Sequence, residues 1–133
     1  MKILITGTSG FIGFHTAAKF LDEGYDVYGV DIENEYYDVQ LKIKRREILN
    51  KHASMKFKFL KEDISKPSIK ALLNDIQPNI IINLAAQAGV RHSLEHPEDY
   101  LYSNIHGFLN LLEYAKTAQQ LENFLFASTS SVY

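Results

Sequence analysis

A glycine-rich turn between an apolar segment and an amphipathic one is the feature that most constrains the fold of this chain. Residues 2–6 form an apolar run with the composition of a strand, and Gly7, Gly10 and Gly13 follow it. Apolar side chains then recur at helical spacing from Phe14 to Leu21. A glycine turn between strand and helix brings backbone N–H groups close to a ligand. It also aims the positive end of the helix dipole at that ligand, which favours a pyrophosphate.

A second predicted strand ends on an acidic residue. Residues 25–30 have strand composition and Asp31 follows them. An acid roughly twenty residues past the glycines is placed to accept hydrogen bonds from a ribose 2′-hydroxyl, whereas it would repel a 2′-phosphate. We therefore predict NAD, rather than NADP, as the ligand. The alternative is a βαβ unit without a ligand, but strand, helix and acid all stand in the order that a binding site requires.

Composition narrows the class of protein. The 133 residues suffice for one domain, and 46% hydrophobic with 23% charged residues is typical of a globular protein. The formal net charge of −2 gives no reason to expect a nucleic-acid or membrane partner. We interpret the basic run 42–46 as a solvated helix face, with a polyanion site as the alternative.

The sequence gives no sign of a disulfide, a metal site, a secretory signal or a membrane-spanning segment. The chain has no cysteine, which excludes a disulfide, a thiolate metal site and a cysteine nucleophile within it. Neither a secretory signal nor a spanning apolar segment is recognisable, so a cytoplasmic location is expected. His92 and His96 are four residues apart, but Pro97 disfavours helix at His96. Chance spacing is the better interpretation, and we predict no metal site.

Strand-like and helix-like segments alternate along the whole chain. After Asp31 we expect a helix over about 39–50, an edge strand over 56–60, a helix from Pro67 to about Ile76 with Ser65 or Lys66 at its cap, a strand over 79–84, a long helix over 97–118 and a strand over 123–127. This order predicts an α/β fold of the Rossmann type, one domain over 1–133. Its doubly wound parallel sheet has five strands in the order 3-2-1-4-5. The ligand should lie across the carboxyl ends of strands 1 and 4, where the order reverses.

Two further strand ends carry residues of interest. Ala85 and Ala86 would let a cofactor ribose pass close to the backbone, although tight helix–sheet packing explains them equally well. Four consecutive hydroxyl side chains, residues 128–131, exceed what one turn or cap requires. A role in orienting an alcohol or relaying a proton is at least as good an interpretation.

The motifs resemble those of the extended short-chain dehydrogenases, the nucleotide-sugar epimerases and dehydratases. The matching residues are Thr6-Gly7-x-x-Gly10-Phe11-Ile12-Gly13, Asp31, Asp63-Ile64, Asn83-Leu84-Ala85-Ala86 and Ser128-Thr129-Ser130-Ser131-Val132-Tyr133. Within that group, two segments are similar to the UDP-glucuronate 4-epimerases: Asp31-x-x-Asn34-x-Tyr36-Tyr37-Asp38-Val39-x-Leu41-Lys42 and Ala85-Ala86-Gln87-Ala88-Gly89-Val90-Arg91-x-Ser93. The resemblance covers the whole chain.

The resemblance implies a redox epimerisation of a UDP-sugar, with UDP-glucuronate as substrate and NAD as cofactor. Hydride leaves C4 of the sugar and returns to the other face of a 4-keto intermediate. By position, the expected cofactor residues are Gly7, Gly10, Phe11, Ile12 and Gly13 at the pyrophosphate; Asp31, Asn34, Asp63 and Ile64 at the adenosine end; and Leu84, Ala85, Ala86 and Asn104 at the nicotinamide end. Thr129 matches the group that hydrogen-bonds the reacting hydroxyl. The candidate substrate contacts are Gln87, Arg91, Ser93, Ser128 and Ser130. A structural ion pair is an equally good interpretation of Arg91.

One departure from the family pattern limits what these residues can do. The general base of the family is the tyrosine of a Tyr-x-x-x-Lys pair, and none of the eight tyrosines here has lysine four residues later. A phenol with an ordinary pKa of about 10 is a poor base at neutral pH. We therefore expect the cofactor half of an enzyme, truncated before the remaining strands and the substrate domain and inactive alone. The alternatives are a stand-alone dinucleotide-binding module or part of a related dehydratase.

The resemblance also implies a homodimer for the full-length protein. In the family the long helix after strand 4 packs in a dimer interface, so Tyr100, Leu101, Phe108 and Leu112 would need cover. Strand 5 would be left as an unsealed edge. The chain alone is therefore expected to self-associate or to be marginally stable.

Overall fold

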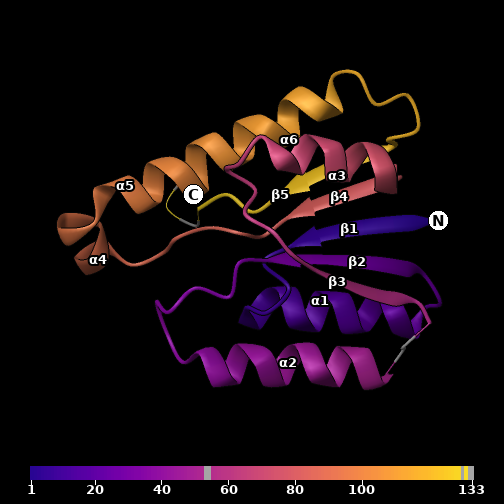
Figure 1. Cartoon of the computed structure of the whole chain (residues 1–133), viewed down its shortest axis with the longest axis horizontal. Helices are drawn as coiled ribbons and strands as arrows, with labels where there is room; N and C mark the ends of the chain where they lie inside the picture. The colour runs from indigo at the N-terminus through magenta and orange to yellow at the C-terminus, as the bar shows by residue number, and fades with distance from the viewer. Residues whose placement is uncertain (53–54, 130, 132–133) are drawn as a thin grey trace.

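Five parallel strands form one sheet with helices on both faces (Figure 1). The computed structural model describes residues 1–52, 55–129 and 131. The strands are β1 (Lys2–Thr6), β2 (Asp26–Asp31), β3 (Phe57–Lys61), β4 (Ile80–Asn83) and β5 (Asn123–Phe126). Their order is β3-β2-β1-β4-β5, so the predicted order is confirmed, as is the edge position of the third strand.

The helices lie in two layers (Figure 1). On one face of the sheet are α1 (Phe11–Asp22) and α2 (Val39–His52). On the other are α3 (Ser68–Ile76) and α6 (Gly107–Ala115), the latter preceded by α4 (Val90–Glu95), α5 (Pro97–Tyr100) and the π-helical turn η1 (Leu101–His106). None of the described helices has both the length and the apolar character needed to span a membrane.

Alternation along β1 divides the core between the two faces. Leu4 points toward α3 and α6, where it packs in a cluster with Leu73 and Leu111. Ile3 and Ile5 belong to the cluster on the opposite face, which receives α1 and α2. Because both faces of β1 are covered, its three central residues, 3–5, are all apolar, as expected of a central parallel strand. All ladders are parallel, so the carboxyl ends of the strands meet at one edge.

Two helical regions differ from the sequence-based expectation. The helix predicted over 97–118 is α5, η1 and α6 in succession, and a short helix, α4, precedes it. His96 separates α4 from α5 with φ −133°, because a residue before proline avoids the helical region. The expected cap of the third helix was wrong by one or two residues: Pro67, not Ser65 or Lys66, occupies the cap position of α3.

Candidate functional site

The turn after β1 has a backbone path that only glycine can follow. Gly7 has φ +75°, and a Cβ there would lie 2.9 Å from the backbone nitrogen of Ala85. A Cβ on Gly13 would lie 2.0 Å from the carbonyl oxygen of Gly7. This close packing sets the start of α1 directly beside the end of β4. Since α1 begins at Phe11, the first N–H groups of the helix have no partner within it and face the crevice end of the sheet.

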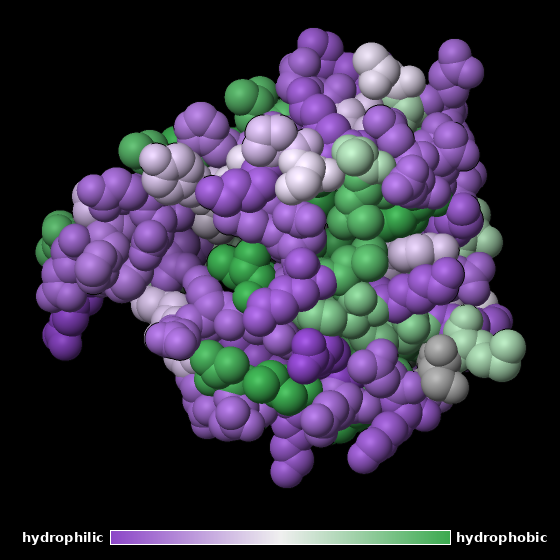
Figure 2. Space-filling view, in the orientation of Figure 1, coloured by the Kyte–Doolittle hydropathy of each residue, from purple (hydrophilic) through white to green (hydrophobic). Residues whose placement is uncertain are grey.

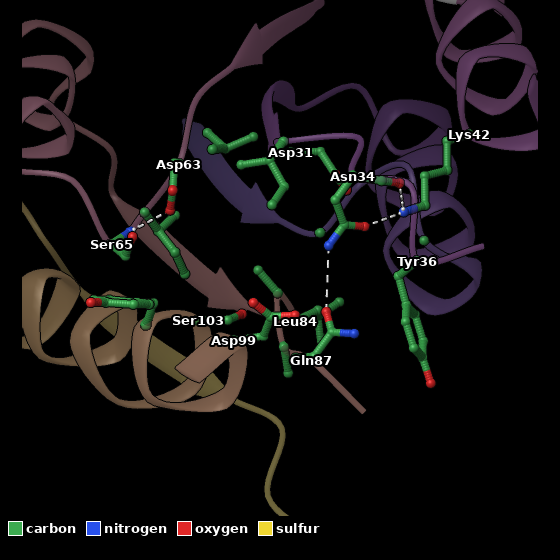
Figure 3. Close-up of a pocket in the computed structure, with 18 of the residues that line it drawn as sticks. Asp31, Asn34, Tyr36, Lys42, Asp63, Ser65, Leu84, Gln87, Asp99 and Ser103 are labelled. Carbon is green, nitrogen blue, oxygen red and sulfur yellow. Dashed lines mark hydrogen bonds between the residues drawn. The ribbon is translucent and has the colours of Figure 1, made fainter. Parts of the chain in front are cut away.

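Asp31 links the glycine turn to the loop after β2. One carboxylate oxygen accepts a hydrogen bond from the Ser9 N–H (3.0 Å), and the other accepts one from the Glu33 N–H (2.8 Å). The side chain is partly buried and lines the crevice, where it is labelled in Figure 3. These bonds hold a carboxylate beside the turn, as a ribose-binding acid requires.

The crevice at the carboxyl ends of the strands is a cavity of about 750 Å³. Its lining brings together most of the predicted cofactor residues from loops distant in sequence: Gly7, Gly10, Asp31, Asn34, Asp63, Ile64, Leu84, Ala85 and Ala86, together with Gln87. Figure 3 shows Asp31 and Asn34 on one side of this space, and Leu84 and Gln87 on another. Phe11, Ile12, Gly13 and Asn104 are not among its lining residues, and the side chains of Phe11 and Ile12 are exposed.

A hydroxyl group at the end of β1 shapes the exit of β4. Thr6 Oγ1 donates to Asn83 Oδ1 (2.6 Å) and accepts from the N–H groups of Leu84 (3.1 Å) and Ala85 (3.0 Å). Thr6 is fully buried. Its role in turning the backbone after β4 was not predicted, because the partners lie 77 to 79 residues away.

The basic run of α2 is only in part the solvated face that its composition suggested, since Lys44 is exposed but Lys42 is buried. Lys42 is only 4% exposed, and its ammonium donates to the carbonyl oxygen (2.7 Å) and to Oδ1 (2.6 Å) of Asn34. Burial lowers the pKa of Lys42, and the carboxylates of Asp31 and Glu33 oppose that shift. Arg45 donates to the Ser9 carbonyl oxygen (3.1 Å). These cations therefore bind the loops around the crevice, a long-range role that a residue-type pattern does not reveal.

A buried carboxylate also links α2 to the glycine turn. Glu33, 6% exposed and at φ +50°, pairs with Arg46 (3.2 Å) and accepts from Ser9 Oγ (3.2 Å). A left-handed conformation at a glutamate is uncommon and is maintained here by its buried partners. Nothing in the sequence pattern signalled this residue.

Asp63 and Ile64, the residues expected at the adenosine end, follow β3. Asp63 Oδ1 accepts from the Ser65 N–H (2.9 Å), as Figure 3 shows. The Ile64 carbonyl oxygen accepts from Asn110 Nδ2 (2.9 Å), and its side chain packs against Gly107, where a Cβ would lie 2.5 Å from Cγ1. The close approach of α6 fixes this loop at the crevice.

The residues expected to contact substrate are more dispersed. Arg91 is exposed at the start of α4 and forms no ion pair with any residue in 1–52, 55–129 or 131. Ser93 Oγ donates to the Val90 carbonyl oxygen (2.6 Å). Ser128 and Thr129 are exposed beyond β5. Ser130, the remaining expected contact, lies outside the described residues, as do Val132 and Tyr133 of the closing motif.

The two spaced histidines belong to an aromatic cluster at the outer end of the crevice. His92 Nε2 lies 2.9 Å from Asp99 Oδ2, and its ring is 4.8 Å from those of Tyr36 and His96. Among the residues that the structure describes, no group of three or more histidine, cysteine or acidic side chains could hold a metal ion.

Strand order, glycine turn and the acid at the end of β2 together define a Rossmann-type domain. The family model described as GDP-mannose 4,6 dehydratase matches residues 4–133, and the chain belongs to this family. Both findings agree with the resemblance to nucleotide-sugar epimerases and dehydratases.

The chain is also similar to individual proteins of known name or structure. Protein CapI of Staphylococcus aureus is 47% identical over 137 residues, covering 100% of this chain and 39% of CapI. UDP-glucuronate 4-epimerase 2 of Arabidopsis thaliana is 40% identical over 134 residues, covering 100% of the chain and 30% of that relative. The structure of UDP-glucuronic acid 4-epimerase from Bacillus cereus in complex with UDP-glucuronic acid and NAD has a TM-score of 0.87 at 37% identity, covering 100% of this chain and 41% of that one. The chain therefore spans about two fifths or less of the length of these proteins.

Proposed function

We propose that these 133 residues form the NAD-binding part of a nucleotide-sugar 4-epimerase that interconverts UDP-glucuronate and UDP-galacturonate. The observation that carries the proposal is the Asp31 carboxylate, held by the Ser9 and Glu33 N–H groups beside a turn in which Gly7 has a positive φ. Support comes from the Bacillus cereus epimerase, which has the same fold in complex with NAD and UDP-glucuronic acid.

The residues fit a dinucleotide by their shape and their donors. The glycine turn lets its backbone pack directly against Leu84, Ala85 and the start of α1, and its N–H groups lie at a helix N-terminus, where a pyrophosphate could accept from them. Gln87 adds a buried side-chain donor at Nε2 that has no partner among the described residues. When bound, NAD would supply reversible hydride transfer at C4 of the sugar.

The chain's own contribution would be binding and orientation. Asp31 would accept from the adenosine ribose, and the small residues Ala85 and Ala86 would border the nicotinamide end. Thr129, exposed beyond β5, would hydrogen-bond the reacting sugar hydroxyl. No tyrosine in the sequence has lysine at the fourth position after it, so we propose that these residues alone do not epimerise. An in-frame Tyr-x-x-x-Lys following Tyr133 in the gene would supply the base, whereas a stop codon there would favour a binding module.

A homodimer of the whole protein is part of this proposal. Exposed apolar side chains follow the outer side of η1 and α6: Leu101, Tyr102, Ile105, Leu109 and Leu112. Figure 2 shows hydrophobic side chains at the outer margin of the molecule on the side of α4, α5, η1 and α6. Sedimentation of the protein as a stable monomer at all accessible concentrations would contradict it.

Calorimetric titration with NAD⁺ and NADH tests the cofactor assignment. We expect both to bind, and Asp31→Ala to weaken binding at least tenfold because charge-assisted ribose contacts are lost. Asp26→Ala is the matched control, since Asp26 is an exposed acid at the other end of β2. Equal affinity in wild type and Asp31→Ala would remove Asp31 from the ribose role.

A further inference from the structure

A series of hydrogen bonds crosses the crevice from α2 to η1. Lys42 Nζ donates to Asn34 Oδ1 (2.6 Å), and Asn34 Nδ2 donates to Gln87 Oε1 over a longer 3.4 Å (Figure 3). Asn104 then holds the backbone of Gln87, accepting from its N–H (2.7 Å) and donating to its carbonyl oxygen (2.9 Å). The series joins the loop after β2 to the loop after β4, across the carboxyl end of β1, which lies between those two strands in the sheet.

Two of its four members are buried, whereas Asn34 is half-buried and Asn104 is exposed. Lys42 is 4% and Gln87 is 7% exposed. The ammonium of Lys42 also lies 4.2 Å from the centroid of the Tyr37 ring, which compensates part of its lost hydration. A buried cation with specific acceptors is costly to misplace, so the near end of the series is well fixed.

The chemistry of Lys42 sets the direction of the Asn34 and Gln87 side-chain amides. An ammonium only donates, so Asn34 must turn its oxygen toward α2 and its NH₂ toward the crevice. Asn34 Nδ2 then requires an acceptor, which fixes Oε1 of Gln87 on the Asn34 side. Nε2 of Gln87 is thereby turned away from Asn34. Gln87 lines the crevice. Its Nε2 atom is buried and has no hydrogen-bond partner among the described residues.

We propose that Lys42, Asn34, Gln87 and Asn104 form a clasp that aims Nε2 of Gln87 at an acceptor oxygen, of phosphate or ribose, in the bound dinucleotide and slows its release. The inference deepens the proposed function and rests on it. It assigns to the cofactor a side chain that the family resemblance had suggested for the substrate. Lys42 is then a positioning residue, which acts through Asn34 and Gln87.

The test is the dissociation of NADH from the whole chain, followed by stopped-flow fluorescence. Gln87→Leu removes the donor, and we expect dissociation about tenfold faster, the effect of losing one hydrogen bond to a buried donor. Gln87→Glu separates the two kinds of acceptor, because a carboxylate repels a phosphate oxygen but accepts from a ribose hydroxyl. Lys44→Met, at an exposed lysine on the same helix, is the matched control and should dissociate at the wild-type rate.

The direction of the amides is tested by Asn34→Asp. The new carboxylate still accepts from Lys42, but it offers Gln87 only acceptors, so Gln87 must turn over and present Oε1 to the crevice. We expect dissociation about tenfold faster in this variant, and a much smaller effect of the same change when Gln87 is already leucine. Simple repulsion between the new carboxylate and the cofactor would give equal effects in both backgrounds and would overturn the proposal.

Failure of the clasp and failure of the proposed function give different results. If the wild-type chain binds neither NAD⁺ nor NADH, the proposed function itself is wrong. If it binds NADH, but Gln87→Leu dissociates at the wild-type rate, the clasp is wrong while the cofactor site stands. The melting temperature of each variant without ligand tests whether the fold is retained. We expect retention, because Gln87→Leu and Asn34→Asp both leave the buried ammonium of Lys42 with an acceptor.

Discussion

Gly13→Ala tests the close packing on which the glycine turn depends. The new Cβ would lie 2.0 Å from the Gly7 carbonyl oxygen, so helix and turn must separate by about 1 Å to reach even the 3.0 Å that real contacts show. Overpacking of this kind costs about 1–3 kcal/mol. We expect the upper end, because the obstacle is backbone and not the tip of a flexible side chain. The gain of alanine over glycine in a helix offsets about 1 kcal/mol, which leaves a net loss of about 2 kcal/mol.

The same shift moves the N–H groups that would cradle a pyrophosphate. Losing one bond from such a group to a charged ligand costs about 1.5–3 kcal/mol, so NAD⁺ affinity should fall at least tenfold. Urea unfolding and calorimetric titration measure the two effects. Gly10→Ala provides a graded comparison, since its Cβ would lie 3.1 Å from the same carbonyl oxygen and should cost less. An unchanged unfolding midpoint together with wild-type affinity in Gly13→Ala would refute this reasoning.

Two further predictions concern buried polar groups. Thr6→Val keeps the shape of the side chain but removes one donor and leaves two N–H groups after β4 without an acceptor. Urea unfolding should show a loss of about 2–3 kcal/mol, and a loss within error of zero would mean that solvent replaces the hydroxyl. Burial lowers the pKa of Lys42 below its usual 10.5, so between the folded-state and unfolded-state values the unfolded chain binds more protons and stability rises with pH. The stability of wild type relative to Lys42→Met should therefore increase as the pH is raised toward 10.5, and a flat or falling difference would contradict the burial of the ammonium.

Local signals in the sequence were enough to predict the sheet and to bring most of the expected cofactor residues to one crevice. The glycine turn and Asp31 lie within one βαβ unit, where periodicity and turn chemistry are read directly. Strand order followed because parallel strands joined by right-handed crossovers leave few arrangements. The crevice residues after β3 and β4 then came together at the same edge of the sheet.

The hydrogen bonds that hold the loops around the crevice could not be predicted in the same way. Lys42 is a lysine in a basic run, and its burial depends on a loop eight residues earlier folding back over α2. Asn34 and Gln87 are 53 residues apart, and Thr6 and Asn83 are 77 apart. Contacts at such separations depend on tertiary packing, which residue type and spacing do not encode.

Competition between NAD⁺ and NADP⁺ for the wild-type chain tests the central claim most directly. The Asp31 carboxylate lies where we propose that the adenosine ribose binds, and Arg45, a nearby cation, already donates to the Ser9 carbonyl oxygen and the Tyr37 hydroxyl. A 2′-phosphate would therefore meet the Asp31 carboxylate, and Arg45 could pair with it only by giving up these two hydrogen bonds. We predict that NAD⁺ binds at least tenfold more tightly than NADP⁺ in calorimetric titration, a difference of about 1.4 kcal/mol or more. Equal affinities, a preference for NADP⁺, or no binding of either would contradict the assignment of Asp31 to the ribose.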